Sequence, residues 1–162
     1  MEVRDWKAVI ITANNKFEAQ VVSSVLQGAG ASSVRVINDN SVDFEVLADA
    51  NLLILSVNAG PIGCYEWVKA LRRAPFSAKK LPVFMLSGAL TLALVEKSRH
   101  AGANAIIGQP ASSAAILNVI RKVLNKPRPF IEAAGYVGPC RRAGIVTAGA
   151  GNARRISDAE AA

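Results

Sequence analysis

The chain has 162 residues, 51% of them hydrophobic, which predicts one domain with a sizeable core. No apolar run approaches the roughly 18 residues of a membrane span, and the charged residues 1–6 do not resemble a signal peptide, so we expect a cytoplasmic protein. The single histidine excludes a multi-histidine metal centre. The net charge of +7 comes mostly from residues 121–162, which weakens any argument that the globular part binds nucleic acid.

Five apolar runs predict the strands of a sheet. The third, Leu52 to Leu55 closing on Ser56, is continuously apolar, which is typical of a central parallel strand buried on both faces. In an open α/β sheet ligands bind just beyond the carboxyl ends of such strands, so Ser56 lies where a reactive side chain is expected. The predicted strands are residues 8–12, 33–37, 52–56, 81–87 and 104–107.

Helical spacing of apolar residues marks five further segments. We expect Phe17 and Val21 to face the core from the first of them, and Arg72 to lie on the solvent face of the third, opposite Trp67. The predicted helices are residues 17–26, 41–48, 64–73, 91–100 and 111–124. This alternation predicts an α/β fold: a flavodoxin-like (βα)5, doubly wound parallel sheet in the strand order 2-1-3-4-5.

The composition changes after residue 126 to a basic segment rich in Gly and Pro, without hydrophobic periodicity. We therefore expect a globular domain over residues 1–126 and an extended, partly disordered tail with little core of its own over residues 127–162. Apolar tail residues are costly to leave in water, so they either dock back on the domain or anchor a partner. The candidates for such contacts are Phe130, Ile131, Tyr136, Arg141 and Arg142.

The order of elements and the residues at the strand ends resemble the receiver domain of bacterial response regulators, over about residues 7–125. The run Leu-Pro-Val-Phe-Met-Leu-Ser at 81–87, the segment Ala-Gly-Ala-Asn-Ala at 101–105 and the turn at Pro110 carry most of the resemblance. In that family, two acidic residues after the first strand hold Mg²⁺, and an aspartate at the end of the third strand accepts a phosphoryl group. A Ser or Thr ends the fourth strand, and a Lys-Pro pair follows the fifth.

The positions of this chain that match the family's working parts are Ala13, Asn14, Ser56, Ser87, Ile106, Gln109 and Pro110. Mg²⁺ needs hard, usually anionic oxygen ligands, which Ala13 and Asn14 do not supply. Ser56 cannot form an acyl phosphate, and Gln109 offers no cation. The resemblance therefore implies a pseudo-receiver that has kept the fold and lost the phosphoryl chemistry, with no metal, no cofactor and no enzymatic activity.

The tail has a resemblance of its own. Residues 128–131, Arg-Pro-Phe-Ile, and 136–142, Tyr-Val-Gly-Pro-Cys-Arg-Arg, are similar to a C-terminal extension of some stand-alone proteobacterial receivers. The chain departs from that pattern at Cys140, where an acidic residue is usual, and at Ala143, where a longer arginine run continues.

Several of these side chains also have simple structural interpretations. Ser56 can hydrogen-bond in a loop, Ser87 can cap the loop that follows it, and Asn14 suits a turn. Cys64 fits a small core position, and without a secretion signal both it and Cys140 are expected as reduced thiols. The single histidine, His100, stands near a helix end, where it can complement the helix dipole.

The predicted function is a protein–protein interaction module of bacterial signal transduction. In the receiver family, the face that corresponds here to Thr91–Leu124 commonly carries dimerisation or output. One alternative is a sensor of an anionic cyclic dinucleotide, bound by Arg141 and Arg142 or by Arg154 and Arg155. Another is a receiver regulated by serine phosphorylation. An enzyme is disfavoured, because the strand-end loops lack a carboxylate, a histidine and a Gly-rich phosphate cradle.

Overall fold

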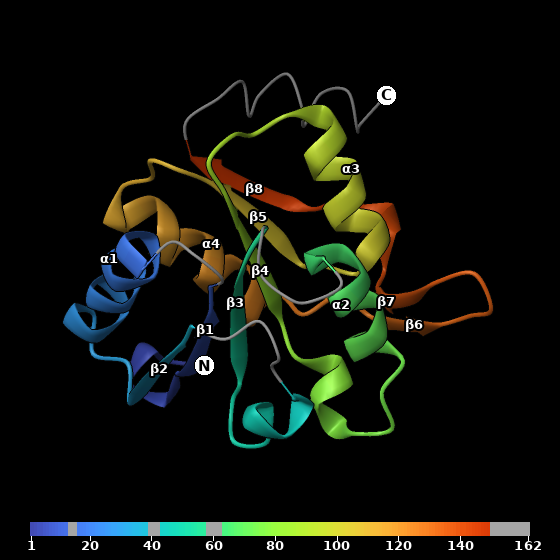
Figure 1. Cartoon of the computed structure of the whole chain (residues 1–162), viewed down its shortest axis with the longest axis horizontal. Helices are drawn as coiled ribbons and strands as arrows, with labels where there is room; N and C mark the ends of the chain where they lie inside the picture. The colour runs from blue at the N-terminus through green and yellow to red at the C-terminus, as the bar shows by residue number, and fades with distance from the viewer. Residues whose placement is uncertain (13–15, 39–42, 58–62, 150–162) are drawn as a thin grey trace.

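A parallel sheet with helices on both faces forms the body of the computed structural model, which describes residues 1–12, 16–38, 43–57 and 63–149 (Figure 1). The strand order β2-β1-β3-β4-β5 confirms the predicted fold. These strands are β1 Lys7–Ile11, β2 Ser33–Ile37, β3 Leu52–Ser56, β4 Val83–Ser87 and β5 Ala105–Gly108. The helices are α1 Lys16–Gly28, α2 Cys64–Arg72, α3 Leu92–Ala101 and α4 Ser113–Asn125.

The two faces of the sheet bury separate hydrophobic clusters, which explains why its central strands are apolar throughout. Because side chains alternate along a strand, Leu53 and Leu55 of β3 pack toward α2 and α3, whereas Leu52 and Ile54 pack toward α1 and α4. Trp6 closes the second cluster and is fully buried. Two helices begin at a polar cap. Thr91 accepts a hydrogen bond from Leu94 N at 3.2 Å, and Ser112 accepts one from Ala115 N at 3.1 Å.

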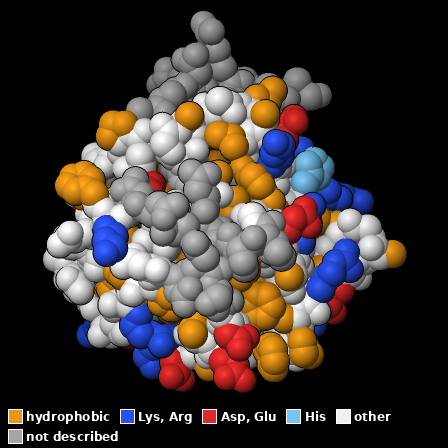
Figure 2. All heavy atoms as spheres, in the orientation of Figure 1, with side chains coloured by type: hydrophobic (Ala, Val, Ile, Leu, Met, Phe, Trp, Pro, Cys, Tyr) orange, Lys and Arg blue, Asp and Glu red, His pale blue; other side chains and the backbone are white. Residues whose placement is uncertain are grey.

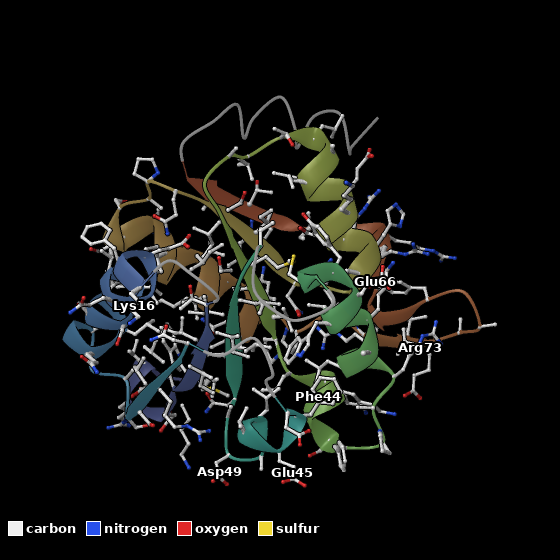
Figure 3. The ribbon with its side chains drawn as sticks, viewed as in Figure 1. Lys16, Phe44, Glu45, Asp49, Glu66 and Arg73 are labelled. Carbon is white, nitrogen blue, oxygen red and sulfur yellow. The ribbon has the colours of Figure 1, made fainter. Side chains whose placement is uncertain are left out.

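The second predicted helix was wrong in type and extent. The described part of that segment is a single 3₁₀ turn, η2 Phe44–Leu47, capped by Asp43, whose side chain accepts from Phe44 N. One turn is enough to bury Leu47, and it places the Phe44 ring edge-on to Trp67 with the centroids 5.1 Å apart (Figure 3). The described residues therefore hold four α-helices instead of the five expected.

Two expected side-chain orientations were also wrong. Phe17 and Val21 of α1 point away from the core, with exposed fractions of 78% and 38%. The burial stripe of α1 is instead formed by Ala19, Val22, Ser23 and Leu26. Arg72, expected in solvent, is 1% exposed. Its guanidinium donates to the backbone oxygens of Lys79, Leu81 and Gly102 and to Asn104 Oδ1, over 2.6 to 2.9 Å.

The tail packs more closely on the domain than the sequence indicated. Strands β6 Phe130–Glu132 and β7 Val137–Pro139 form an antiparallel hairpin. Beyond it, β8 Val146–Gly149 joins the main sheet as a sixth strand, parallel to β5. Figure 1 shows β8 running beside β5 in the region between α3 and α4. Among the described residues, no helix has the length and apolar composition needed to cross a bilayer.

Candidate functional site

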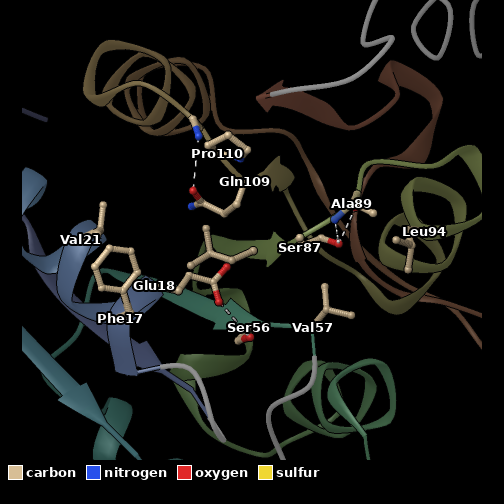
Figure 4. A pocket seen from close by; sticks show the side chains of 13 residues that line it. Phe17, Glu18, Val21, Ser56, Val57, Ser87, Ala89, Leu94, Gln109 and Pro110 are labelled. Atoms are coloured by element: carbon tan, nitrogen blue, oxygen red, sulfur yellow. Dashed lines mark hydrogen bonds between the residues drawn. The ribbon is translucent and has the colours of Figure 1, made fainter.

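A pocket of about 810 Å³ opens beyond the carboxyl ends of β3, β4 and β5 (Figure 4). Ser56, Ser87 and Gln109, which come from the ends of these three strands, all line it. The fold thus brings together three of the residues that the sequence singled out. The position agrees with the general rule that open parallel sheets bind ligands at this edge.

The polar centre of the pocket is a contact between Ser56 and Glu18. The Ser56 hydroxyl, on a residue that is 8% exposed, donates to Glu18 Oε2 at 3.4 Å. Glu18 reaches the pocket from the first turn of α1. Burial raises the pKa of this carboxyl above its ordinary value, and the hydrogen bond from Ser56 partly counters the shift. The sequence analysis missed Glu18; its place in the first turn of the helix after β1 was the available signal.

The other two strand-end residues hold the loops that frame the pocket. The Ser87 hydroxyl donates to the carbonyl of Ala89 and accepts from Ala89 N, which closes the loop after β4. Gln109 Oε1 accepts from Ala111 N at 3.3 Å. Its Nε2 is buried and has no hydrogen-bond partner in the structure. The peptide bond between Gln109 and Pro110 is cis.

Of the remaining predicted positions, Pro110 also lines this pocket, whereas Ile106 does not. Ile106 is fully buried on the side of the sheet covered by α2 and α3, so it belongs to the core. Ala13 and Asn14 lie outside the described residues. Both cysteines are free thiols, and burial raises the pKa of Cys64 to about 11, which makes it a poor nucleophile at neutral pH.

The described donor set does not suit Mg²⁺. The pocket offers one carboxylate, from Glu18, beside neutral hydroxyl and amide groups. Octahedral Mg²⁺ is usually held by anionic oxygens in near-ideal geometry. Within the described ranges, no three or more His, Cys, Asp and Glu side chains lie close enough to hold a metal ion.

Two of the predicted tail residues contact each other, and one of them also contacts α3. Tyr136 is buried and donates to Pro139 O at 2.7 Å, and the Arg141 guanidinium lies 4.1 Å from its ring centroid. Arg141 Nη1 also donates to His100 Nδ1 at 2.7 Å. Figure 2 shows basic side chains beside the histidine ring. Phe130 is half-buried near the Arg72 guanidinium, whereas Arg142 is exposed.

A second arginine ties the tail to the sheet. Arg128 donates through Nη1 to the carbonyls of Cys140 and Gly144, and through Nη2 to Asn104 O at 3.0 Å. These acceptors stand at the entry of β5 and just before β8. The guanidinium fork therefore joins the sixth strand to the strand it pairs with.

Comparison with solved structures gives a consistent fold. A protein assigned as a response regulator from Chloroflexus aurantiacus J-10-fl has a TM-score of 0.67 and 22% identity, covering 75% of this chain and 100% of its own. The chemotaxis response regulator CheY4 of Vibrio cholerae has a TM-score of 0.60 and 25% identity, covering 73% and 98%. The receiver domain of a DNA-binding response regulator from Colwellia psychrerythraea 34H has a TM-score of 0.64 and 17% identity, covering 75% and 100%.

The chain has the fold of a response regulator receiver domain. No protein-family model matches the sequence, and no curated protein matches it significantly. In this fold the pocket around Ser56 lies at the carboxyl ends of the strands.

Proposed function

We propose that this chain is a phosphorylation-independent pseudo-receiver that acts as a protein–protein interaction module in bacterial signalling. The observation that carries the proposal is the Ser56 hydroxyl bonded to Glu18, in a pocket whose described lining contains no Lys or Arg. A phosphoryl group would meet a carboxylate there and no cation to balance its charge. Phosphoryl transfer depends on positioning and on compensation of that charge.

The strand β8 forms part of the surface that we propose for protein contact. It lies along the edge of β5, within the face expected over Thr91–Leu124. A partner, or a second copy in a homodimer, would therefore contact β8 together with the outward sides of α3 and α4. Lys97 on α3 and Lys122 on α4 are exposed, so both helices offer basic side chains that would suit an acidic partner.

The two alternative functions have less structural support. In the nucleotide hypothesis, Arg141 would have to leave Tyr136 and His100 to reach a phosphate; Arg154 and Arg155 lie outside the described residues. In the serine-phosphorylation hypothesis, a kinase would have to reach a hydroxyl on a residue that is 8% exposed. Calorimetry of the full chain with cyclic diguanylate tests the first, and intact mass after kinase treatment tests the second.

The leading proposal is tested by phosphorylation with a small phosphodonor. The full chain is incubated with acetyl phosphate and Mg²⁺, and its intact mass is measured before and after acid treatment. We expect no phosphoryl adduct. A stoichiometric, acid-labile adduct would overturn the phosphorylation-independent mechanism.

The interaction surface is tested by charge reversal. We expect Lys97→Glu with Lys122→Glu to abolish capture of partners by the full chain from the source cells, or its self-association in light scattering. Lys16→Glu at the start of α1, a helix outside the proposed face, is the matched control (Figure 3). If the control loses the same partners, or the double variant loses none, the proposed face is wrong.

A further inference from the structure

The pocket beyond β3, β4 and β5 is largely apolar for a place where phosphoryl chemistry is expected. Apolar side chains from five segments of the chain surround it: Phe17, Val21, Val57, Leu86, Leu94 and Pro110. In Figure 4, Phe17 and Val21 stand at the α1 rim of the pocket, on the same side as Glu18. Phe17 is 78% exposed, so a bound molecule can cover an aromatic ring that the fold leaves in water.

The charge in this pocket has one sign. Glu18 contributes the one ionisable side chain of the described lining, and Ser56 orients its carboxylate by donating to Oε2. The other polar groups are the Ser87 hydroxyl, which is engaged with Ala89, and the Gln109 amide. Gln109 Nε2 is buried without a partner, so it can donate to an acceptor atom of a ligand.

We propose that this pocket binds a small organic cation, with an ammonium group at the Glu18 carboxylate and an apolar or aromatic body against Phe17 and Val21. The volume of about 810 Å³ lies within the range of small-molecule sites. A carboxylate in a partly dry setting attracts a cation more strongly than it would in water. The same carboxylate repels an anion, and the described lining offers no basic side chain to compensate.

The surroundings of Glu18 support this choice. Burial raises the pKa of the carboxyl, so the folded protein disfavours the charged form of a group that it nevertheless keeps at the pocket. A bound ammonium reverses that disadvantage, because an opposite charge within hydrogen-bond distance favours the carboxylate. An inorganic divalent cation does not fit as well, since it requires more oxygen ligands than one carboxylate.

This inference goes beyond the proposed interaction module: it adds a small-molecule site through which that module would be regulated. It does not depend on which protein surface is used for output. It can fail while the protein remains inert to acetyl phosphate, and it can hold even if a phosphoryl adduct forms, so the two proposals are tested separately.

The experiment compares three probes that share a phenylethyl body and differ in the head group: phenethylammonium, 3-phenylpropionate and 2-phenylethanol. Each is titrated into the ¹⁵N-labelled full chain, and amide shifts are followed at Val57, Gly88 and Ala111 around the pocket. We expect saturable shifts with phenethylammonium and affinities at least about tenfold weaker for the other two probes, the effect of one charge-assisted hydrogen bond.

Glu18→Gln is the deciding variant, because it keeps the shape of the side chain and removes the charge. We expect it to reduce the preference for phenethylammonium over 2-phenylethanol to within about twofold. Glu45→Gln, an exposed position on η2 at the other end of the sheet, is the control and should bind like the parent (Figure 3). Equal affinity for cation and anion, no saturable shift with any probe, or an unchanged preference in Glu18→Gln would each overturn the proposal.

Discussion

Replacing Arg72 with Met should destabilise the protein strongly, although this residue is a cation in a hydrophobic core. Its guanidinium makes five hydrogen bonds to four acceptors, three of them backbone oxygens. Burial lowers the pKa of Arg72 to about 10, so it remains charged at neutral pH. These contacts join the end of α2, the entry to β4 and the turn between α3 and β5.

The expected loss is about 3–5 kcal/mol in the free energy of unfolding. Met fills most of the volume, so the cavity contribution is small. The two backbone acceptors with buried bonds, Leu81 O and Gly102 O, would lose their donor, at about 1–3 kcal/mol each. Relief of the desolvation of a buried cation offsets part of this. The bond to Asn104 Oδ1 adds less, because that oxygen also accepts from Val83 N at 2.9 Å.

Urea unfolding followed by circular dichroism measures this change. Arg73→Met is the matched control, since Arg73 is the next residue, is exposed and makes one bond of 3.3 Å, to Ala134 O (Figure 3). We expect the control to change stability by less than about 0.5 kcal/mol. Arg72→Lys keeps the charge but lacks the planar guanidinium, so its loss of stability should lie between those of Arg72→Met and Arg73→Met. This variant keeps the test usable even if Arg72→Met does not fold. A loss below about 1 kcal/mol in both Arg72 variants would refute the reasoning.

Three further predictions concern the tail and the pocket. Gly102→Ala should lower the free energy of unfolding, measured in urea, by at least about 1–2 kcal/mol, because φ is +105° and the new Cβ would lie 2.9 Å from an arginine carbon. The control Gly28→Ala has open space around its new Cβ and should not destabilise the protein. Arg128→Met should lower hydrogen-exchange protection of β8 at least about tenfold and leave β4 unchanged, with the exposed Arg121→Met as control. Because the pKa of Glu18 is raised, the folded state keeps this carboxyl protonated at a higher pH than the unfolded state does. The free energy of unfolding should therefore fall as pH rises from 4.5 through the folded pKa, and Glu18→Gln should not show this fall.

The central strands β3, β4 and β5 could be predicted from the sequence because they are buried on both faces. That burial makes each of them a short apolar run with little ambiguity, and β3 begins and ends at the predicted residues. The edge strand β2 also has the predicted bounds, although its residues are half-buried or exposed. The strand β8 could not be predicted in the same way. Val146–Gly149 is four residues long, it lies at the edge, and half of it is Ala and Gly, so its strand state comes from pairing with β5.

Arg72 was misassigned because its environment is set by residues distant in sequence. Helical spacing places Arg72 opposite Trp67 and therefore predicts solvent, but the acceptors that satisfy it belong to segments up to 32 residues away. The site was partly predictable, because strand ends meet at one edge and so Ser56, Ser87 and Gln109 had to lie close together. Glu18 was missed, although its place in the first turn of the helix after β1 puts it near the same edge; its contact with Ser56 spans 38 residues.

The position of β8 changes how the tail must be separated from the domain in any functional experiment. A chain ending at residue 126 would lose β8 and the Arg128 fork together, and it would leave the edge of β5 uncovered. An open apolar edge promotes association on its own. Partners lost on that truncation would therefore not distinguish a binding tail from a damaged sheet. A chain ending after Gly149 keeps every described strand. Loss of partners on that truncation would therefore assign binding to the last residues, and retention would assign it to residues 1–149.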